Sequence, residues 1–263
     1  MKPHERIILP LDVSDISKAQ NLVDLLALHV GVFKIGFESI YSTMVDLLLE
    51  PNDEAVYLLN RVRILAREIS PEKAFLDVKL ADIPNTVGNA VKALARLGVK
   101  MINIHASAGA KVIKAAVENK GSSQLFGVTV LTSISDNECL SIFGASAQVK
   151  VFDFARMLIE NGADGIICAP KEGLALRQGA YFDDLTIACP NIRPEWAATK
   201  EERERVKDDQ NVDRQMTPGQ AVIAGIDMLV IGRPITKPPV EIGGPVEAAN
   251  LIAEEISKVL KEV

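Results

Sequence analysis

Cysteine is scarce in this sequence, and its spacing excludes the common sulfur-based sites. The 263 residues include only Cys139, Cys168 and Cys189, an odd number with no C-x-x-C spacing. Zinc sites and disulfide frameworks need closely spaced or even-numbered cysteines, so we expect neither here. Cys168 and Cys189 fall in apolar runs, where a thiol packs as a small apolar side chain. We therefore assign the cysteines to the core of a protein kept in a reducing compartment.

Long hydrophobic runs and an excess of positive charge are also lacking. No apolar stretch of 18 residues occurs, and the polar residues 1–6 lead directly into a candidate strand. The formal net charge is −6, so no overall basic field would attract nucleic acid or an anionic membrane. We expect a cytoplasmic protein that binds neither. An anionic ligand would have to be held by a few local Lys and Arg side chains.

Short apolar runs alternate with amphipathic helical patterns along the whole chain. This alternation predicts a parallel sheet, and eight strands is the number that closes a (β/α)8 TIM barrel. An open doubly wound sheet would favour a glycine-rich turn after its first strand, but residues 12–17 contain no glycine. We therefore predict an α/β protein with a single (β/α)8-barrel catalytic domain over residues 1–263. The predicted strands are residues 7–12, 32–36, 74–79, 101–105, 126–131, 165–169, 185–189 and 228–232. The predicted helices include residues 16–28, 87–97, 110–119, 149–161, 218–224 and 245–260.

Two connections are longer than a barrel needs. Residues 39–70 have room for two helices, divided near Pro51, and residues 191–217 form a polar stretch after the seventh strand. The charge run at residues 200–205 is typical of a solvated helix face. Because the second insert leaves the C-terminal end of a barrel strand, where ligand-covering loops occur, we expect it to fold over a bound ligand.

An ionic cluster is predicted at the C-terminal end of the third strand. Asp77 and Lys79 are two residues apart, so both side chains point to one face of a strand, and Asp82 follows where the chain must leave the sheet. An Asp-x-Lys triplet alone is more often a solvated ion pair. In a barrel, however, active sites lie at the C-terminal strand ends, where Asp12 and Lys34 also fall. Lys34, Asp77, Lys79 and Asp82 would then form an alternating chain of two cations and two anions, and if buried together each charge would support the ionisation of the others.

A phosphate site is predicted after the seventh and eighth strands, where such barrels often bind phosphate. Gly232 allows close backbone approach to an anion, Arg233 offers a planar donor fork, and Arg193 supplies a second cation. The alternative is a simple Gly-Arg-Pro turn with Arg233 in solvent. His105, at the end of the fourth strand, is more typical of a hydrogen-bonded structural histidine.

Together these residues resemble the orotidine 5′-phosphate decarboxylase family. The matching segments follow the family's order from the first predicted strand to the last, and the run from Asp77 to Thr86 is the most specific of them. The segments are Leu11-Asp12-Val13, Lys34-Ile35-Gly36, Asp77-Val78-Lys79-Leu80-Ala81-Asp82-Ile83-Pro84-Asn85-Thr86, Asn103-Ile104-His105-Ala106, Val128-Thr129-Val130-Leu131-Thr132-Ser133, Ile192-Arg193-Pro194, Met216-Thr217-Pro218 and Ile231-Gly232-Arg233-Pro234.

The resemblance implies a (β/α)8 barrel that converts orotidine 5′-monophosphate (OMP) to UMP and CO2, the last step of UMP biosynthesis, without metal or organic cofactor. It also implies a homodimer in which each site is completed by the partner chain. Lys79 would donate a proton to C6 beside Asp77, and Lys34 with Asp82 of the partner subunit would complete the charge array. The implied substrate contacts are Asp12 and Lys34 on the ribose side, Ile83 and Thr86 across the interface, Thr132 at the pyrimidine, and Arg193, Gln210, Gly232 and Arg233 at the phosphate.

The sequence departs from the family pattern at several points. Asn191 stands where the family usually has glycine, and Gln210 is two residues farther from Met216 than the family spacing. The inserts at residues 39–70 and 191–217 are longer than in compact members. Pro10 is unusual in a first strand, although a barrel strand accepts proline near its end.

Two other functions fit parts of the pattern. The Mg²⁺-dependent 3-keto-gulonate-phosphate decarboxylases and hexulose-phosphate synthases share the D-x-K-x-x-D core, but they lack the Ile-Pro-Asn-Thr that follows here at residues 83–86. The second alternative is a non-catalytic nucleotide-phosphate binder on the same scaffold. The complete set of charged positions in this chain argues against that alternative.

Overall fold

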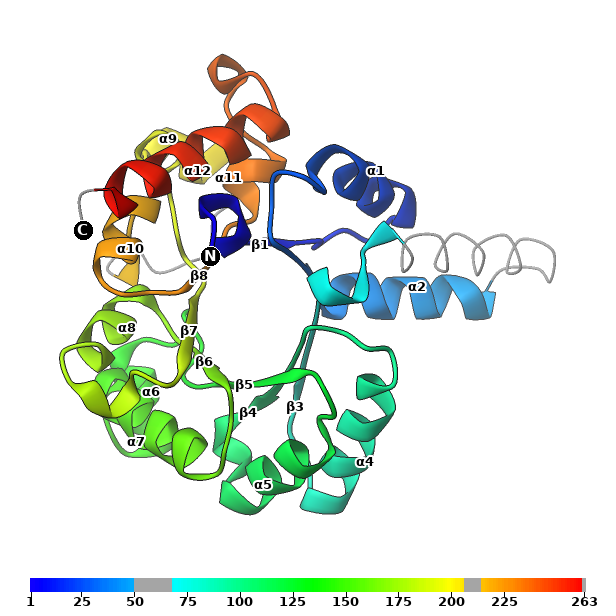
Figure 1. Ribbon diagram of the computed structural model, residues 1–263, viewed down its shortest axis with the longest axis vertical. Helices are drawn as coiled ribbons and strands as arrows, with labels where there is room; N and C mark the ends of the chain where they lie inside the picture. The colour runs from blue at the N-terminus through cyan, green and yellow to red at the C-terminus, as the bar shows by residue number, and fades with distance from the viewer. Residues whose placement is uncertain (50–67, 206–213, 262–263) are drawn as a thin grey trace.

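Eight parallel strands close into a barrel in the computed structural model, with helices around the outside (Figure 1). The structure describes residues 1–49, 68–205 and 214–261. Each strand pairs with the next in sequence, and β8 pairs with β1. The (β/α)8 TIM barrel predicted from the sequence is therefore confirmed. The strands are β1 (Ile7–Pro10), β2 (Val32–Ile35), β3 (Ala74–Leu80), β4 (Met101–His105), β5 (Gln124–Val128), β6 (Gly165–Ile167), β7 (Thr186–Cys189) and β8 (Met228–Val230).

The helices cover the outer face of the barrel (Figure 1). The described α-helices are α1 (Ile16–Leu26), α2 (Phe37–Leu49), α4 (Pro84–Ala95), α5 (Ala110–Asn119), α6 (Asp136–Phe143), α7 (Ala147–Glu160), α8 (Pro170–Leu176), α9 (Lys200–Arg205), α10 (Pro218–Ile223), α11 (Arg233–Thr236) and α12 (Pro245–Leu260). The six predicted helices are present, with ends that differ by a few residues. The short helices α6, α8 and α11 were not predicted from the sequence.

The alternation of apolar side chains along the strands produces two layers of core. Side chains pointing inward, including Ile8, Phe75 and Phe126, pack together and fill the barrel. Their sequence neighbours point outward and pack beneath the helices, where Ile7 and Leu9 join the larger core. Both layers exclude water, so the barrel is a rigid support for the residues at the C-terminal strand ends.

Some strand ends differ from the prediction, and one difference affects the site. The fifth strand covers Gln124–Val128 rather than residues 126–131. Its partner β6 ends at Ile167, and the Thr129 hydroxyl donates to the Ile167 carbonyl at 2.8 Å, which closes the ladder. Thr132 therefore lies in a loop rather than directly after a strand. Pro10 is the last residue of β1, as its missing N–H requires.

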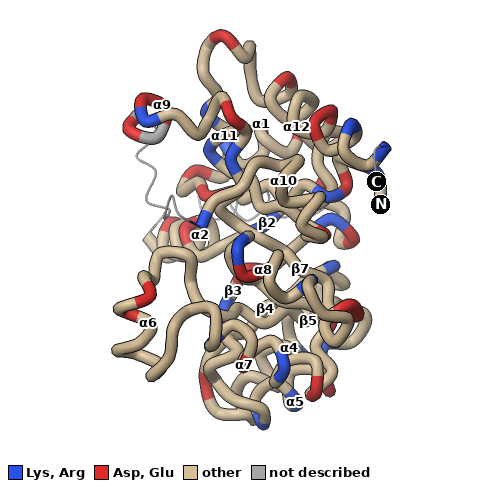
Figure 2. The backbone as a smooth tube through the Cα atoms, turned by 90° about the vertical axis from the view of Figure 1, so that its left-hand side faces the viewer, with Lys and Arg blue, Asp and Glu red and all other residues tan. Residues whose placement is uncertain are grey.

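The two long connections are only partly described. The first begins with α2, which runs outward from the barrel in Figure 1 and has no buried residue. The predicted division near Pro51 lies outside the described residues. In the second, the charge run forms α9, as predicted. Lys, Arg, Asp and Glu are interspersed over the elements seen in Figure 2, and α9 carries both signs. No helix among the described residues is both long and apolar enough to cross a membrane.

Candidate active site

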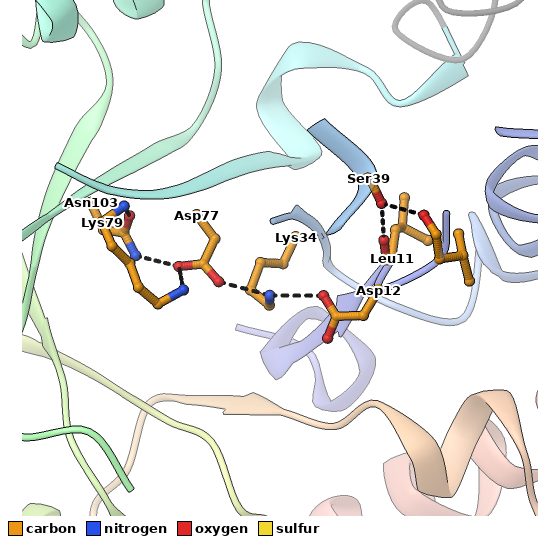
Figure 3. A network of polar contacts seen from close by, with 8 residues as sticks. Leu11, Asp12, Lys34, Ser39, Asp77, Lys79 and Asn103 are labelled. Carbon is orange, nitrogen blue, oxygen red and sulfur yellow. Dashed lines mark hydrogen bonds and ion pairs between the residues drawn. The ribbon is translucent and has the colours of Figure 1, made fainter. Parts of the chain in front are cut away.

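Asp77 is the centre of a charged network at the C-terminal ends of β1, β2 and β3 (Figure 3). The residue is 5% exposed, and its carboxylate accepts from two ammonium groups. Lys34 Nζ lies 2.7 Å from Asp77 Oδ2, and Lys79 Nζ lies 2.6 Å from Asp77 Oδ1. Lys34 Nζ also lies 3.3 Å from Asp12 Oδ1. Four side chains from three different strand ends thus form one chain of alternating charge.

The backbone around Lys79 departs from regular strand geometry. The register between β3 and β4 shifts between Leu76 and Leu80, and Lys79 has φ +41, in the left-handed region that favours glycine. A non-glycine residue held there costs roughly 1–3 kcal/mol, and such strain is found mostly at functional sites. Asp77 and Lys79 do meet, but through this irregularity rather than through the simple two-residue repeat predicted from the sequence.

Asn103 holds this irregular backbone in place. The residue is fully buried on β4, and its Oδ1 accepts a 2.7 Å hydrogen bond from the Lys79 backbone N–H. Its Nδ2 donates a 2.7 Å hydrogen bond to Asp77 Oδ1. One amide therefore fixes both the Lys79 backbone and the Asp77 carboxylate. Asn103 was not proposed as a site residue from the sequence, although an amide within an apolar strand was a usable signal.

Opposite charges keep the buried groups of the network ionised. Burial alone would raise the pKa of Asp77, but the charges of Lys34 and Lys79 outweigh it and lower that pKa from 3.8 to about 2. Burial would likewise lower the pKa of Lys34, yet Asp77 and Asp12 raise it above its usual value. Burial, and then the charge of Lys79, lowers the pKa of His105 below its usual value.

Small and uncharged residues shape the space around the charges. A Cβ on Gly36 would lie 3.2 Å from Lys34 Nζ and 3.4 Å from Asp12 Oδ1, so glycine leaves room for the network. The Ser39 hydroxyl donates to the carbonyls of Leu11 and Val13, which flank Asp12 (Figure 3). The ring of Phe37 lies 5.3 Å from Lys79 Nζ. Sequence reasoning identified neither Ser39 nor Phe37.

Asp82 does not join the network of its own chain. Its Oδ1 accepts a 2.6 Å hydrogen bond from the Ile83 backbone N–H, and its side chain forms no ion pair with any described residue. The reason is local, because β3 ends at Leu80 and the chain turns at once into α4, with Ile83 as the N-cap. Within one chain the second carboxylate is therefore Asp12. Ile83 is 65% exposed, and Thr86 lies on the exposed side of the first turn of α4.

Two of the predicted phosphate residues follow the last two strands, Arg193 after β7 and Arg233 after β8, which pairs with β1. Arg193 and Arg233 line one pocket, together with Trp196, Lys237 and Glu202. The Arg193 backbone N–H donates to the Met216 carbonyl at 2.9 Å, so Arg193 is fixed at the base of the second insert. A Cβ on Gly232 would lie 2.8 Å from the Pro10 ring, which gives this glycine a packing reason as well. Thr132 is half-buried in the loop after β5, and Gln210 lies outside the described residues.

An eight-stranded barrel with a buried charge array after β1 to β3 and two arginines lining a pocket after β7 and β8 has the architecture of an enzyme for a phosphorylated substrate. Residues 5–250 match the model of the orotidine 5′-phosphate decarboxylase / HUMPS family. The chain belongs to this family.

Individual relatives agree with the family match. The chain is 33% identical to the orotidine 5′-phosphate decarboxylase of Gloeothece citriformis, over 97% of this chain and 99% of that protein. It is 37% identical to the enzyme of the same name from Nostoc sp., over 89% and 91% of the two chains. The crystal structure of orotidine 5′-phosphate decarboxylase from Lactobacillus acidophilus superposes with a TM-score of 0.70 at 29% identity, over 95% of this chain and 98% of that one.

Proposed function

We propose that this chain is an orotidine 5′-phosphate decarboxylase, a carboxy-lyase that converts OMP to UMP and CO2 in pyrimidine biosynthesis. The observation that carries the proposal is the Lys34–Asp77–Lys79 network, in which a buried carboxylate holds two ammonium groups within 2.7 Å. The curated relatives named above and the arginine-lined pocket support it. We take residues 1–263 as one catalytic domain.

Lys79 is the residue to which we assign the chemistry. When the C6–carboxylate bond of OMP breaks, CO2 leaves and the bonding electron pair stays on C6, with no adjacent π-system to accept it. An ammonium fixed beside C6 stabilises that charge and then transfers a proton to form UMP. Lys79 then regains a proton from solvent. Asp77 and Asn103 fix the side chain and the backbone of Lys79, so little reorganisation is needed during the reaction.

Asp77 has a second role in this proposal. A carboxylate held ionised beside the substrate carboxylate repels it in the ground state, and the repulsion is relieved as CO2 departs. The depressed pKa of Asp77, about 2, means that the group carries its charge at neutral pH. Lys34 and Asp12 then bind the ribose hydroxyls.

The remaining substrate contacts surround this centre. Arg193, Arg233 and the backbone at Gly232 bind the phosphate, Gln210 closes over it, and Thr132 contacts the pyrimidine. Binding energy from the phosphate, remote from the breaking bond, orients the ring against Lys79. No organic cofactor or metal takes part in this scheme.

A homodimer completes the site in this proposal. Asp82 is exposed and has no ion-pair partner among the described residues, and the side chain of Ile83 beside it is largely exposed. Exposed apolar side chains also line α2, including Tyr41, Met44 and Leu48. Exposed apolar side chains of this kind support association with a second copy, which brings Asp82, Ile83 and Thr86 of the partner subunit to the site. The buried, unpaired cysteines are in keeping with a cytoplasmic location.

The direct test is OMP consumption by the purified protein, followed by absorbance, with and without EDTA. We expect turnover to UMP at the same rate in both. Absence of turnover would refute the proposal, and loss of activity in chelator would favour the Mg²⁺-dependent members of the same family. Lys79→Met should lower the turnover of OMP by about 10⁴-fold or more, while UMP still binds. The exposed Lys92→Met serves as the control for loss of one lysine charge.

A further inference from the structure

A buried ion pair outside the charge network joins three loops at the mouth of the barrel. Glu172 lies in the first turn of α8, after β6, and Arg214 lies just before α10 in the second insert. Arg214 Nη2 is 2.9 Å from Glu172 Oε1, and the two side chains are only 9% and 7% exposed. Nothing in the proposed chemistry uses either residue.

Arg214 also hydrogen-bonds to the loop that contains Thr132. Its Nη1 donates to the carbonyls of Leu131, at 3.2 Å, and Ile134, at 3.0 Å. These two carbonyls flank Thr132, the proposed pyrimidine contact. A single guanidinium therefore connects the loop after β5 to the carboxylate of Glu172 in the first turn of α8.

Arg214 is also connected, through Met216, to the proposed phosphate site. Two residues after Arg214, Met216 bridges to Ile192, and the Met216 carbonyl accepts a 2.9 Å hydrogen bond from the Arg193 N–H. Arg193 lines the pocket that also contains Arg233. The position of Arg214 is thus linked through three residues of chain to the proposed phosphate site.

The buried Glu172–Arg214 ion pair is not an efficient way to stabilise the fold. Buried charges must lose their hydration, and an ion pair compensates for this only when its remaining polar atoms are also satisfied. Among the described residues, no group hydrogen-bonds to Glu172 Oε2, Arg214 Nε or Arg214 Nη2, although all three atoms are buried, so the contact between Nη2 and Glu172 Oε1 is an ion pair without hydrogen-bond geometry. A well-packed apolar pair would hold the three loops at lower cost, so the placement of these charges needs a different explanation.

We propose that Glu172 and Arg214 are positioning residues that hold the pyrimidine-side loop and the phosphate-side segment in one fixed relation. The ion pair with Glu172 fixes the orientation of the Arg214 guanidinium. Arg214 in turn fixes the carbonyls of Leu131 and Ile134 and the base of the second insert. The inference rests on the proposed function, because it requires one substrate with a base at one end and a phosphate at the other. Neither residue touches the reacting atoms.

The test compares Glu172→Gln, Arg214→Met and the double variant with the starting enzyme. We expect each single variant to lower kcat/KM for OMP roughly tenfold to hundredfold, because misplacement of about 1 Å far from the chemistry has effects of this size. UMP, which spans both loops, should bind at least tenfold more weakly, whereas inorganic phosphate should change less than threefold. The double variant should regain thermal stability, since no charge is left unpaired, without regaining kcat/KM.

Arg177→Met is the matched control. Arg177 also donates to backbone carbonyls, of Phe182 and Leu185, and pairs with Asp227 at 2.6 Å, but at the opposite end of the barrel. This variant should lose stability with little change in kcat/KM. Recovery of kcat/KM together with stability in the double variant would overturn the proposal, as would equal weakening of UMP and phosphate. If the starting enzyme itself does not consume OMP, the proposed function fails, and the binding comparison still tests the pair.

Discussion

Asn103 donates a 2.7 Å hydrogen bond from Nδ2 to Asp77 Oδ1, across the gap between β4 and β3. Its other amide atom accepts from the Lys79 backbone N–H. The proposed proton donor thus has its side chain fixed by Asp77 and its strained backbone fixed by Asn103. The charge array depends on a neutral residue from a neighbouring strand.

Replacing Asn103 with Leu should therefore damage both stability and turnover. The change leaves the Lys79 N–H without its partner, and an unsatisfied buried group of this kind costs about 1–3 kcal/mol. We expect kcat to fall more than KM rises, by about 10²-fold, because the Lys79 ammonium loses its alignment with C6. Steady-state kinetics and denaturant unfolding measure the two effects. Asn89→Leu, at an exposed amide on α4, should change neither, and an unchanged kcat in Asn103→Leu would disprove the positioning role.

The pKa of Asp77 predicts how stability depends on acid. The folded-state pKa, about 2, lies below the usual 3.8, so ionised Asp77 stabilises the fold above pH 3.8, and this contribution is lost as pH falls toward 2. The difference corresponds to about 2 kcal/mol, of which about half is lost by pH 3. The free energy of unfolding, measured at pH 6 and pH 3 at one protein concentration, should fall by less in Asp77→Asn than in the starting protein. An equal fall in both proteins would show that Asp77 is not the titrating group.

The parts of the fold and site that follow local patterns could be predicted from the sequence. The eight apolar runs locate the strands, and a barrel brings the strand ends together, which is why Lys34, Asp77 and Lys79 were expected to meet. Asp12 was expected at the same mouth of the barrel as a ribose contact, and its ion pair with Lys34 was not predicted. Arg193 and Arg233 were expected on one side of the mouth for the same reason. The short helices α6 and α8 have only two turns each, too few for their periodicity to be recognised.

Other parts depend on three-dimensional detail that no local pattern encodes. The positive φ of Lys79 arises from a register shift against β4, and the contact of Phe37 with Lys79 depends on the angle at which α2 leaves β2. Glu172 and Arg214 come from different loops, so their pairing follows from loop geometry rather than from strand order. From the residue pattern alone Asp82 was expected in one array with Asp77 and Lys79, and from the family resemblance in the partner's site. Within one chain the early turn into α4 separates it from Asp77 and Lys79.

Gly36 provides a test of how closely the charges must pack. An added methyl group would lie 3.2 Å from Lys34 Nζ, 3.4 Å from Asp12 Oδ1 and 3.7 Å from Asp77 Oδ2. Gly36→Ala should push Lys34 off the carboxylates and lower kcat/KM by about tenfold to hundredfold while the barrel still folds. Gly179→Ala is the control, since nothing lies within 4 Å of its added Cβ. Equal kinetics in the two variants would show that the network tolerates a shift of Lys34.

The last prediction concerns which chain uses Asp82. Lys79→Met and Asp82→Asn should each be strongly impaired alone, the second by about 10²-fold, because each removes one charge from every site. If Asp82 acts across a dimer interface, a mixed dimer of the two variants has one site with both residues intact and one with both replaced. Random pairing makes half of the dimers mixed, so co-expressed, equimolar chains should recover about a quarter of full activity.

The alternative arrangement predicts a different result. If Asp82 served its own chain, each site of a mixed dimer would lack one of the two residues, and activity would stay at the level of the separate variants. Light scattering of the same samples gives the oligomeric state, and a mixture of Lys79→Met with Asp77→Asn is the control. Those two residues lie 2.6 Å apart in one chain, so their mixed dimers should show no recovery. Recovery in the first mixture and not in the second would establish that Asp77 and Lys79 serve one chain's site and Asp82 the partner's.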